Sequence, residues 1–117
     1  MTDRELLELA AKAAGISWKP AKTDAGKMCE LKFGLWLNIV QEPTESTRRQ
    51  FNPLNDDGDA LRLAVKLDIE VRHVNGAAHA GRANYFWCTE DWFPDGDKVA
   101  ATRRAITLAA SSIGRKL

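Results

Sequence analysis

The sequence predicts an α+β domain in which a small, mostly antiparallel sheet of three to four strands has three helices packed around it. Segments with apolar residues at helical spacing lie near both ends of the chain and in its middle. Between them lie segments in which apolar and polar residues alternate, as they do in half-buried strands. Each of these segments has one apolar and one polar-leaning face, which is typical of an antiparallel sheet.

Length and composition indicate one ordinary globular domain. A chain of 117 residues fits a single domain, residues 1–117, that can fold without a metal or a disulfide. The net charge of +1 gives no bulk attraction to nucleic acid or membranes. Two cysteines are too few for a disulfide framework, and no segment resembles a signal peptide or a membrane span. We therefore expect a cytoplasmic protein with free thiols.

The first helix is predicted to begin after Thr2. Thr2 and Glu5 match the S/T-x-x-E capping box, in which each side chain satisfies a backbone N–H of the other residue. Gly15 can adopt the left-handed conformation that ends a helix. The apolar residues at helical spacing between these two ends are Leu6, Leu9, Ala10 and Ala13.

Alternating or aromatic segments predict the strands. Trp36 and Phe86 add apolar surface to the second face of the sheet. We therefore expect helices over part of both faces, in an α/β/α sandwich-like arrangement. The predicted strands are residues 31–39, 67–74 and 83–89, with a short extra strand at 16–18.

Polar segments at 19–27 and 41–50 are predicted loops. Asn75-Gly76 is a turn signal between two predicted strands. The connection that follows it, residues 77–82, looks longer than the two-residue turn of a tight hairpin.

The acidic stretch at 56–59, DDGD, is predicted to start a helix and not to bind a ligand. As a calcium loop it would place Pro53 at the first ligand position and Ala64 at the twelfth, and neither supplies an oxygen from its side chain. A phosphate would be repelled by the acids. As a helix start it supplies a cap from Asn55, Asp56 or Asp57 and places acids at the positive end of the helix dipole. The helix is expected from about Asp57 to Lys66, with Leu61, Ala64 and Val65 packing inward.

The last helix is predicted after a turn at residues 93–96. Asp97 can cap it. One apolar stripe is expected to face the core, formed by Val99, Thr102, Ile106, Ala109, Ala110 and Ile113.

Two of these segments also carry a family likeness. FNPLNDDGDALRLAVKL (51–67) and ATRRAITLAASSIG (101–114) resemble the phage ABA-sandwich domain, a family of small bacteriophage and prophage proteins. Its members read W-N-P-x-x-D-D-G-D-A-L-R-L and then A-T-R-R-A-I; this chain has Phe51 in place of the tryptophan. The resemblance implies a phage origin and helices on both sides of a sheet. It implies no activity and no catalytic residues.

Cys29, His73, His79 and Cys88 could be combined into a zinc site. Structural zinc sites usually take their ligands as pairs two to five residues apart, and this set has no such pair. We predict that the protein holds no metal and no cofactor.

The aromatic segment near residue 90 contains candidate binding residues. Trp87 and Tyr85 share one face of a strand and could stack on a base or a partner's side chain, while Trp92 is expected in an exposed loop, as suits an interface. The alternative is that these rings only build the core. Arg103 and Arg104 on the last helix are candidates for contacts with phosphates.

The sequence shows no motif of a nucleophile with its base and no phosphate-binding glycine loop. We therefore predict that this protein is not an enzyme. We expect it to bind a host or phage protein in the cytoplasm of a bacterial host cell, as a monomer or a weak homodimer. The alternative function is nucleotide or nucleic-acid binding through the aromatic residues with Arg103 and Arg104.

Overall fold

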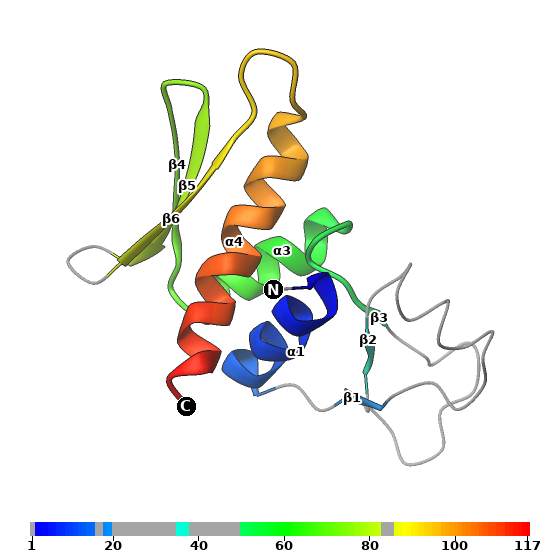
Figure 1. Ribbon diagram of the computed structural model, residues 1–117. Helices are drawn as coiled ribbons and strands as arrows, with labels where there is room; N and C mark the ends of the chain where they lie inside the picture. Colours follow the sequence, from blue (N-terminus) through cyan, green and yellow to red (C-terminus); the bar gives the residue numbers. More distant parts are fainter. Residues whose placement is uncertain (1, 16–17, 20–34, 38–49, 83–85) are drawn as a thin grey trace.

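A computed structural model describes residues 2–15, 18–19, 35–37, 50–82 and 86–117 (Figure 1). The three helices of this part are α1 (Asp3–Ala14), α3 (Asp57–Lys66) and α4 (Lys98–Arg115). One antiparallel sheet has the order β4 (Glu70–Val74), β5 (Ala77–Arg82) and β6 (Phe86–Asp91). A second, smaller antiparallel sheet has the order β1 (Trp18–Lys19), β2 (Leu35–Leu37) and β3 (Gln50–Phe51).

The α+β fold is confirmed, with three helices and a three-stranded antiparallel sheet in the described part of the chain. Figure 1 shows α4 in the centre, with the β4–β5–β6 sheet along one side of it and α1 and α3 on the other. The described helices therefore lie on one face of this sheet, so the described part of the chain does not show the helices expected over the second face. The predicted loops at 19–27 and 41–50 and most of the strand at 31–39 lie outside the described residues. None of the described helices is long and apolar enough to cross a membrane.

Helices α1 and α4 pack side by side and run in the same direction. The Arg104 guanidinium contacts the Asp3 carboxylate at 3.0 Å, and Lys12 Nζ donates to the Leu117 carbonyl at 3.0 Å, one contact near each end of α1. The backbones approach so closely that a Cβ on Gly114 would run into the carbonyl oxygen of Leu9. Small side chains allow this approach, and the buried ones include Ala10, Ala11, Ala105, Ala109 and Ala110.

Strand β5 corrects the prediction for residues 77–82. These residues form the central strand, because Val74 pairs with Ala77 across a two-residue turn. Asn75 and Gly76 have φ values of 53° and 75°, as in a type I′ hairpin turn. Alanine and glycine have low strand propensity, so the segment does not stand out as a strand in the sequence. Its small side chains let α4 lie close to the sheet, and Ala78 and Ala80 are fully buried beneath it.

Helix α3 spans the predicted residues, and Asp56 is its cap: the Asp56 carboxylate accepts from the Asp59 N–H at 2.8 Å. The Asp59 carboxylate is buried and accepts from the Asn52 N–H at 2.9 Å and from the Arg62 guanidinium at 2.7 Å. Asp57 contacts Arg103 at 2.6 Å. Each acid of the DDGD stretch thus has a structural contact, as the helix interpretation requires.

The prediction that Leu61 and Val65 pack inward is wrong. Leu61 is 65% exposed and Val65 is 69% exposed. Ala60 and Leu63 are buried instead, together with the predicted Ala64. Helix α3 therefore has two apolar stripes, and the one with Ala60, Leu63 and Ala64 faces the core, while the Asp59 carboxylate accepts from the Asn52 N–H.

The turn at 92–97 leads into α4. Asp97 caps the helix as predicted, accepting from the N–H groups of Val99 at 2.9 Å and Ala100 at 3.2 Å. Val99 does not join the buried stripe, since it is 50% exposed. Helix α4 is instead buried on two sides by the sheet and α1, so its buried residues also include Ala101, Ala105, Thr107, Ser111 and Gly114.

Candidate functional site

The predicted site residues do not form one cluster. Tyr85 lies outside the described residues. Trp87 is on the face of the sheet that points away from α4, whereas Trp92 packs against the core near the start of α4. Arg103 and Arg104 lie on α4 and are held by acids. In the described part of the fold, the aromatic residues and these two arginines therefore do not form a single binding surface.

Trp87 lies on an open, polar sheet face. Strand pairing places it on the same face as Arg72, and the Arg72 guanidinium sits 4.9 Å from the centre of the Trp87 ring. The ring is 38% exposed. Arg72 also contacts Glu70 at 3.5 Å on this face. The arrangement combines a cation–π contact with a surface ion pair.

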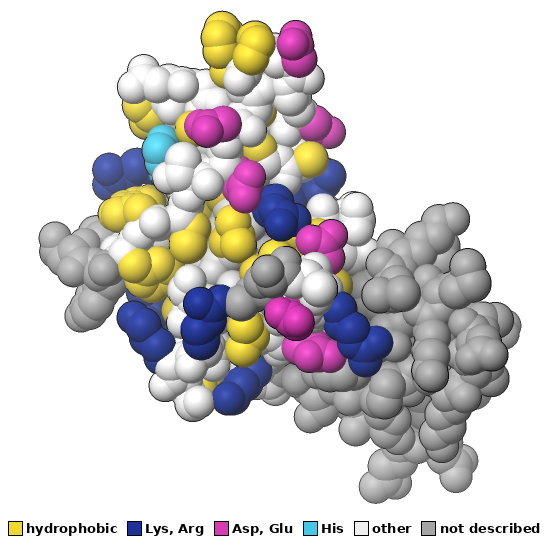
Figure 2. Space-filling view, in the orientation of Figure 1, with side chains coloured by type: hydrophobic (Ala, Val, Ile, Leu, Met, Phe, Trp, Pro, Cys, Tyr) yellow, Lys and Arg dark blue, Asp and Glu magenta, His cyan; other side chains and the backbone are white. Residues whose placement is uncertain are grey.

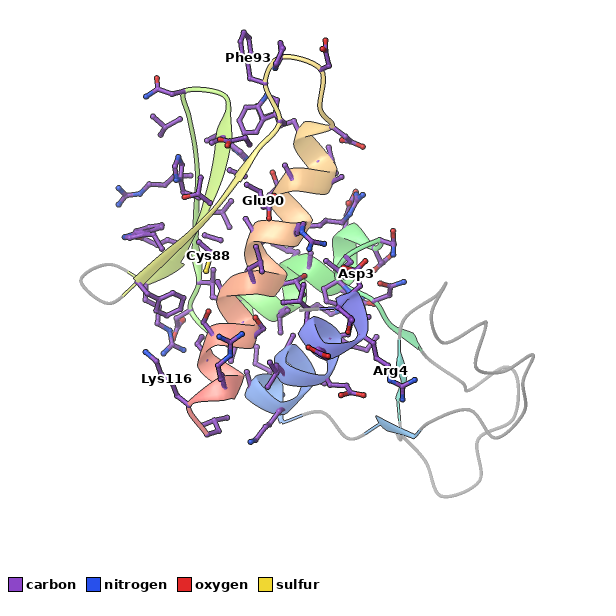
Figure 3. The ribbon with its side chains drawn as sticks, viewed as in Figure 1. Asp3, Arg4, Cys88, Glu90, Phe93 and Lys116 are labelled. Atoms are coloured by element: carbon purple, nitrogen blue, oxygen red, sulfur yellow. The ribbon has the colours of Figure 1, made fainter. Side chains whose placement is uncertain are left out.

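Trp92 is half-buried, not exposed in a loop as predicted. Its ring meets the His73 ring edge-on at 5.6 Å, and Lys98 Nζ lies 5.4 Å from its centre. The exposed aromatic residue of this turn is the next one, Phe93, which is 75% exposed. Figure 3 shows Phe93 at the tip of the loop between β6 and α4, pointing away from the molecule.

Arg103 and Arg104 tie elements together. Arg103 is only 17% exposed at its side chain; it donates to the Leu54 carbonyl at 2.9 Å and contacts Asp57 at 2.6 Å. Arg104 lies between Asp3 of α1 at 3.0 Å and Glu90 of β6 at 3.3 Å. Figure 3 shows Asp3 and Glu90 flanking α4, and Figure 2 shows acidic and basic side chains interspersed over this face. These arginines have carboxylate partners within the fold.

The residues considered for zinc are also separated. His73 and His79 point to opposite faces of the sheet, since His79 pairs with Arg72, the neighbour of His73. His73 shares a hydrogen bond with Thr102 at 2.8 Å, and His79 shares one with Thr89 at 2.9 Å. Cys88 faces α4, where its Sγ lies 3.9 Å from Ser112 Oγ (Figure 3). Cys29 lies outside the described residues.

A groove lies where α3, β4 and the start of α4 meet, and we call it the α3–β4 groove. It encloses about 360 Å³. Apolar side chains form most of its wall, and three of them, Leu61, Val71 and Val99, are exposed. Its lining residues are Asp57, Ala60, Leu61, Val71, His73, Lys98, Val99, Thr102, Arg103 and Ile106.

The polar groups of the α3–β4 groove stand at its margins. Arg103 is paired with Asp57 on one side. His73 is held by Thr102 and by the edge of Trp92 on the other. Lys98 lies over the Trp92 ring. A ligand for this groove would therefore place apolar groups inside and meet polar groups at the rim.

One wall of the groove, β4, is an edge strand of the three-stranded sheet in the described part of the chain. The Trp92 N–H donates to the Gly76 carbonyl at 3.0 Å. Gly76 and Trp92 are therefore a hydrogen-bonded pair, and every second pair along β5 and β6 from this point is hydrogen-bonded too. By the same alternation Glu70, Arg72 and Val74 turn their backbone groups toward β5. Val71 and His73 therefore turn their N–H and C=O groups toward the open edge. Their side chains point to the α4 side of the sheet and line the groove.

This combination suits an extended chain segment. Such a segment can pair its backbone with an exposed sheet edge and place alternate side chains in pockets beside it. Sequence reasoning missed the groove because it placed Leu61 and Val99, two of its lining residues, in the core. One signal in the sequence could have indicated it. Residues 60–67 contain more apolar residues than a single buried stripe of a helix can hold.

Searches against protein-family models, curated proteins and solved structures found no match to this chain.

Proposed function

We propose that this protein works by binding a protein partner and catalyses no reaction. An extended segment of the partner adds to the edge of β4 and places alternate apolar side chains in the α3–β4 groove. The observation that carries this proposal is the position of the open backbone groups of Val71 and His73 beside the exposed aliphatic side chains of Leu61 and Val99.

The energetic case rests on two terms. Each backbone hydrogen bond to an edge strand contributes about 1 kcal/mol. Burial of an exposed aliphatic side chain contributes up to roughly 1.5–3 kcal/mol. Leu61, Val71 and Val99 supply exposed aliphatic surface in the groove, and the cost of ordering a peptide offsets part of this gain.

We further propose that the protein is a phage or prophage accessory protein that acts in the cytoplasm of a bacterial host. The support is the resemblance carried by residues 51–67 and 101–114. Polar residues of these segments make structural contacts: the Asp59 carboxylate accepts from the Asn52 N–H, and Arg103 joins α4 to Asp57. Such contacts would stabilise the fold of this family, while the choice of partner would depend on the residues of the groove.

Nucleotide or nucleic-acid binding is the alternative. Its support is the exposed Trp87 ring beside Arg72 on the open sheet face. The carboxylates that pair with Arg103 and Arg104 weaken it. A titration with mixed oligonucleotides at several salt concentrations tests it, because binding through phosphates falls steeply as salt rises.

The partner-binding proposal can be tested with a displayed library of unstructured peptides selected on the purified protein. Selected peptides should carry apolar residues at alternate positions. On binding they should slow the exchange of the Val71 and His73 amides, which hydrogen-exchange NMR can measure residue by residue.

Two proline variants form a matched pair for this test. Val71→Pro removes an N–H that points to the open edge of β4 and should abolish peptide binding. Thr89→Pro removes an N–H that points to the open edge of β6 and should leave binding unchanged. Neither change removes a backbone hydrogen bond to β5, although Thr89→Pro also loses the side-chain hydrogen bond between Thr89 and His79. Equal binding by both variants, or protection at β6 in place of β4, would contradict the proposal.

A further inference from the structure

Strand β4 has a sequence that can pair with itself. Its residues are Glu-Val-Arg-His-Val, with Glu70 and Arg72 on the outer face of the sheet and Val71 and His73 on the inner face. Every residue of the strand is exposed. A second copy of the chain is thus one occupant to be considered for the edge that the proposed partner would use.

Two antiparallel copies of β4 can bond only where open backbone groups face each other. These groups belong to Val71 and His73 in each copy. Three registers meet this condition, since the two-fold axis can pass through Val71, Arg72 or His73. Each register places different side chains opposite one another, and cross-strand pairs decide between them.

Charge decides against the axis at Arg72. It would place Arg72 directly opposite Arg72 of the second copy, and like charges in that position are unfavourable. The axis at His73 would pair Val71 with Asn75, which lies in the hairpin turn and has a left-handed φ of 53°. That register leaves little regular strand to pair.

The axis at Val71 gives compatible cross-strand pairs of side chains. It places Glu70 opposite Arg72 of the second copy, and Arg72 opposite Glu70 of the second copy. These residues form non-hydrogen-bonded pairs across the new edge, the type in which side chains come closest. On the inner face, Val71 meets its counterpart beside the α3–β4 groove. The His73 N–H can donate to the Ile69 carbonyl of the second copy, whereas the Ile69 N–H already donates to the Ala64 carbonyl at 2.8 Å and the Ile69 side chain is buried in the core.

We infer that the protein forms a homodimer through β4, in the register centred on Val71, which joins the two three-stranded sheets into one of six strands. The inference rests on the proposed function, because it assigns the same edge and groove a second occupant. The dimer covers the open groups of Val71 and His73, so a partner segment binds only after the copies separate. Self-association therefore regulates access to the site, and partner binding weakens as protein concentration rises.

Charge reversal tests the register. Glu70→Arg leaves two arginines on each β4, and Arg72→Glu leaves two glutamates. Each single variant should dimerise at least roughly tenfold more weakly than the wild type, because two attractive pairs become two repulsive pairs. The double variant, Glu70→Arg with Arg72→Glu, restores opposite charges across the axis and should dimerise like the wild type. An equimolar mixture of the two single variants should form a heterodimer, since each arginine then meets a glutamate.

The measurement is sedimentation equilibrium from roughly 1 µM to 1 mM protein, a range that brackets weak self-association. Amide exchange of Val71 and His73 is followed in the same samples. A wild type that stays monomeric over this range would overturn the inference. So would single variants that dimerise as well as the wild type, or a mixture that does not form the heterodimer.

Failure of this inference can be told apart from failure of the proposed function. If the wild type is monomeric but selected peptides still protect Val71 and His73, only the dimer is wrong. If the dimer forms in the stated register and no peptide competes with it, the edge serves self-association alone and the partner-binding function is wrong.

Discussion

The two halves of α4 differ in how their neighbours pack against them. In the half that ends at Gly114, small buried residues lie against α1 and β5, and the backbones of α1 and α4 come into direct contact. In the half that begins at Lys98, larger aliphatic residues line the α3–β4 groove, and α3 and β4 form its other walls. Small residues close one interface within the chain. The other interface stays open, with Val99 and Leu61 exposed.

The largest effect expected from this comparison separates two leucines of α3. Leu63→Ala should reduce the free energy of unfolding by about 3 kcal/mol, because Leu63 is 2% exposed and its loss leaves a cavity. Leu61→Ala should change it by less than about 0.5 kcal/mol, because Leu61 lines the open groove. Urea unfolding followed by circular dichroism measures both. Equal losses would mean that the groove is closed in solution.

A glycine pair tests the closed half. Gly114→Ala should cost about 2 kcal/mol or more, because the added Cβ meets the Leu9 carbonyl oxygen and one helix must shift. Gly58→Ala should stay within about 0.5 kcal/mol of the wild type, since its Cβ would meet only the movable ends of Arg62 and Asp56 and helix propensity improves. Thermal and urea unfolding are the measurements. A neutral Gly114→Ala would show that α1 and α4 are not in backbone contact.

The buried carboxylate of Asp59 fixes α3 as a wall of the groove. Asp59→Ala should cost about 1.5 kcal/mol, because the Asn52 N–H then stays buried without its acceptor. Asp59→Asn keeps one acceptor oxygen and should cost less. The Asn52 amide should also exchange faster in Asp59→Ala, as NMR can show. An unchanged exchange rate at Asn52 would argue against this contact.

The smallest effect is expected at Arg104. Arg104→Gln removes partly exposed contacts to Asp3 and Glu90, and such surface pairs contribute at most about 1 kcal/mol together. High salt should reduce the difference from the wild type, because screening weakens the same contacts. A loss above about 2 kcal/mol would show that Arg104 is needed for packing and not only for its charge.

The element boundaries were accessible to sequence reasoning where a local signal marks them. Thr2, Asp56 and Asp97 are caps, and each is satisfied by bonds within a few residues. The turn at Asn75-Gly76 was also visible, but the strand after it was not. Residues 77–82 become a strand because α4 covers their small side chains, and that packing joins distant parts of the chain.

The α3–β4 groove could not be predicted from the sequence for a related reason. Residues 60–67 carry more apolar positions than one stripe requires, and the sequence pattern does not decide which of them turns inward. Which stripe is buried is seen only in the folded chain, where α3 packs against α4 and the Asp59 carboxylate accepts from the Asn52 N–H. Trp92 gives a similar lesson, because His73 and Lys98 hold it against the protein from elements that the sequence does not place together.

The pairing of α1 with α4 also bears on how the chain is made. Contacts such as Arg104 to Asp3 join residues 101 positions apart. At roughly 5–20 residues per second, a ribosome completes α1 several seconds or more before α4 is available. The apolar side of α1, with Leu6, Leu7 and Ala10, has to wait for that time without its final neighbour. We therefore expect this side of α1 to stay exposed or to make only transient contacts until α4 emerges.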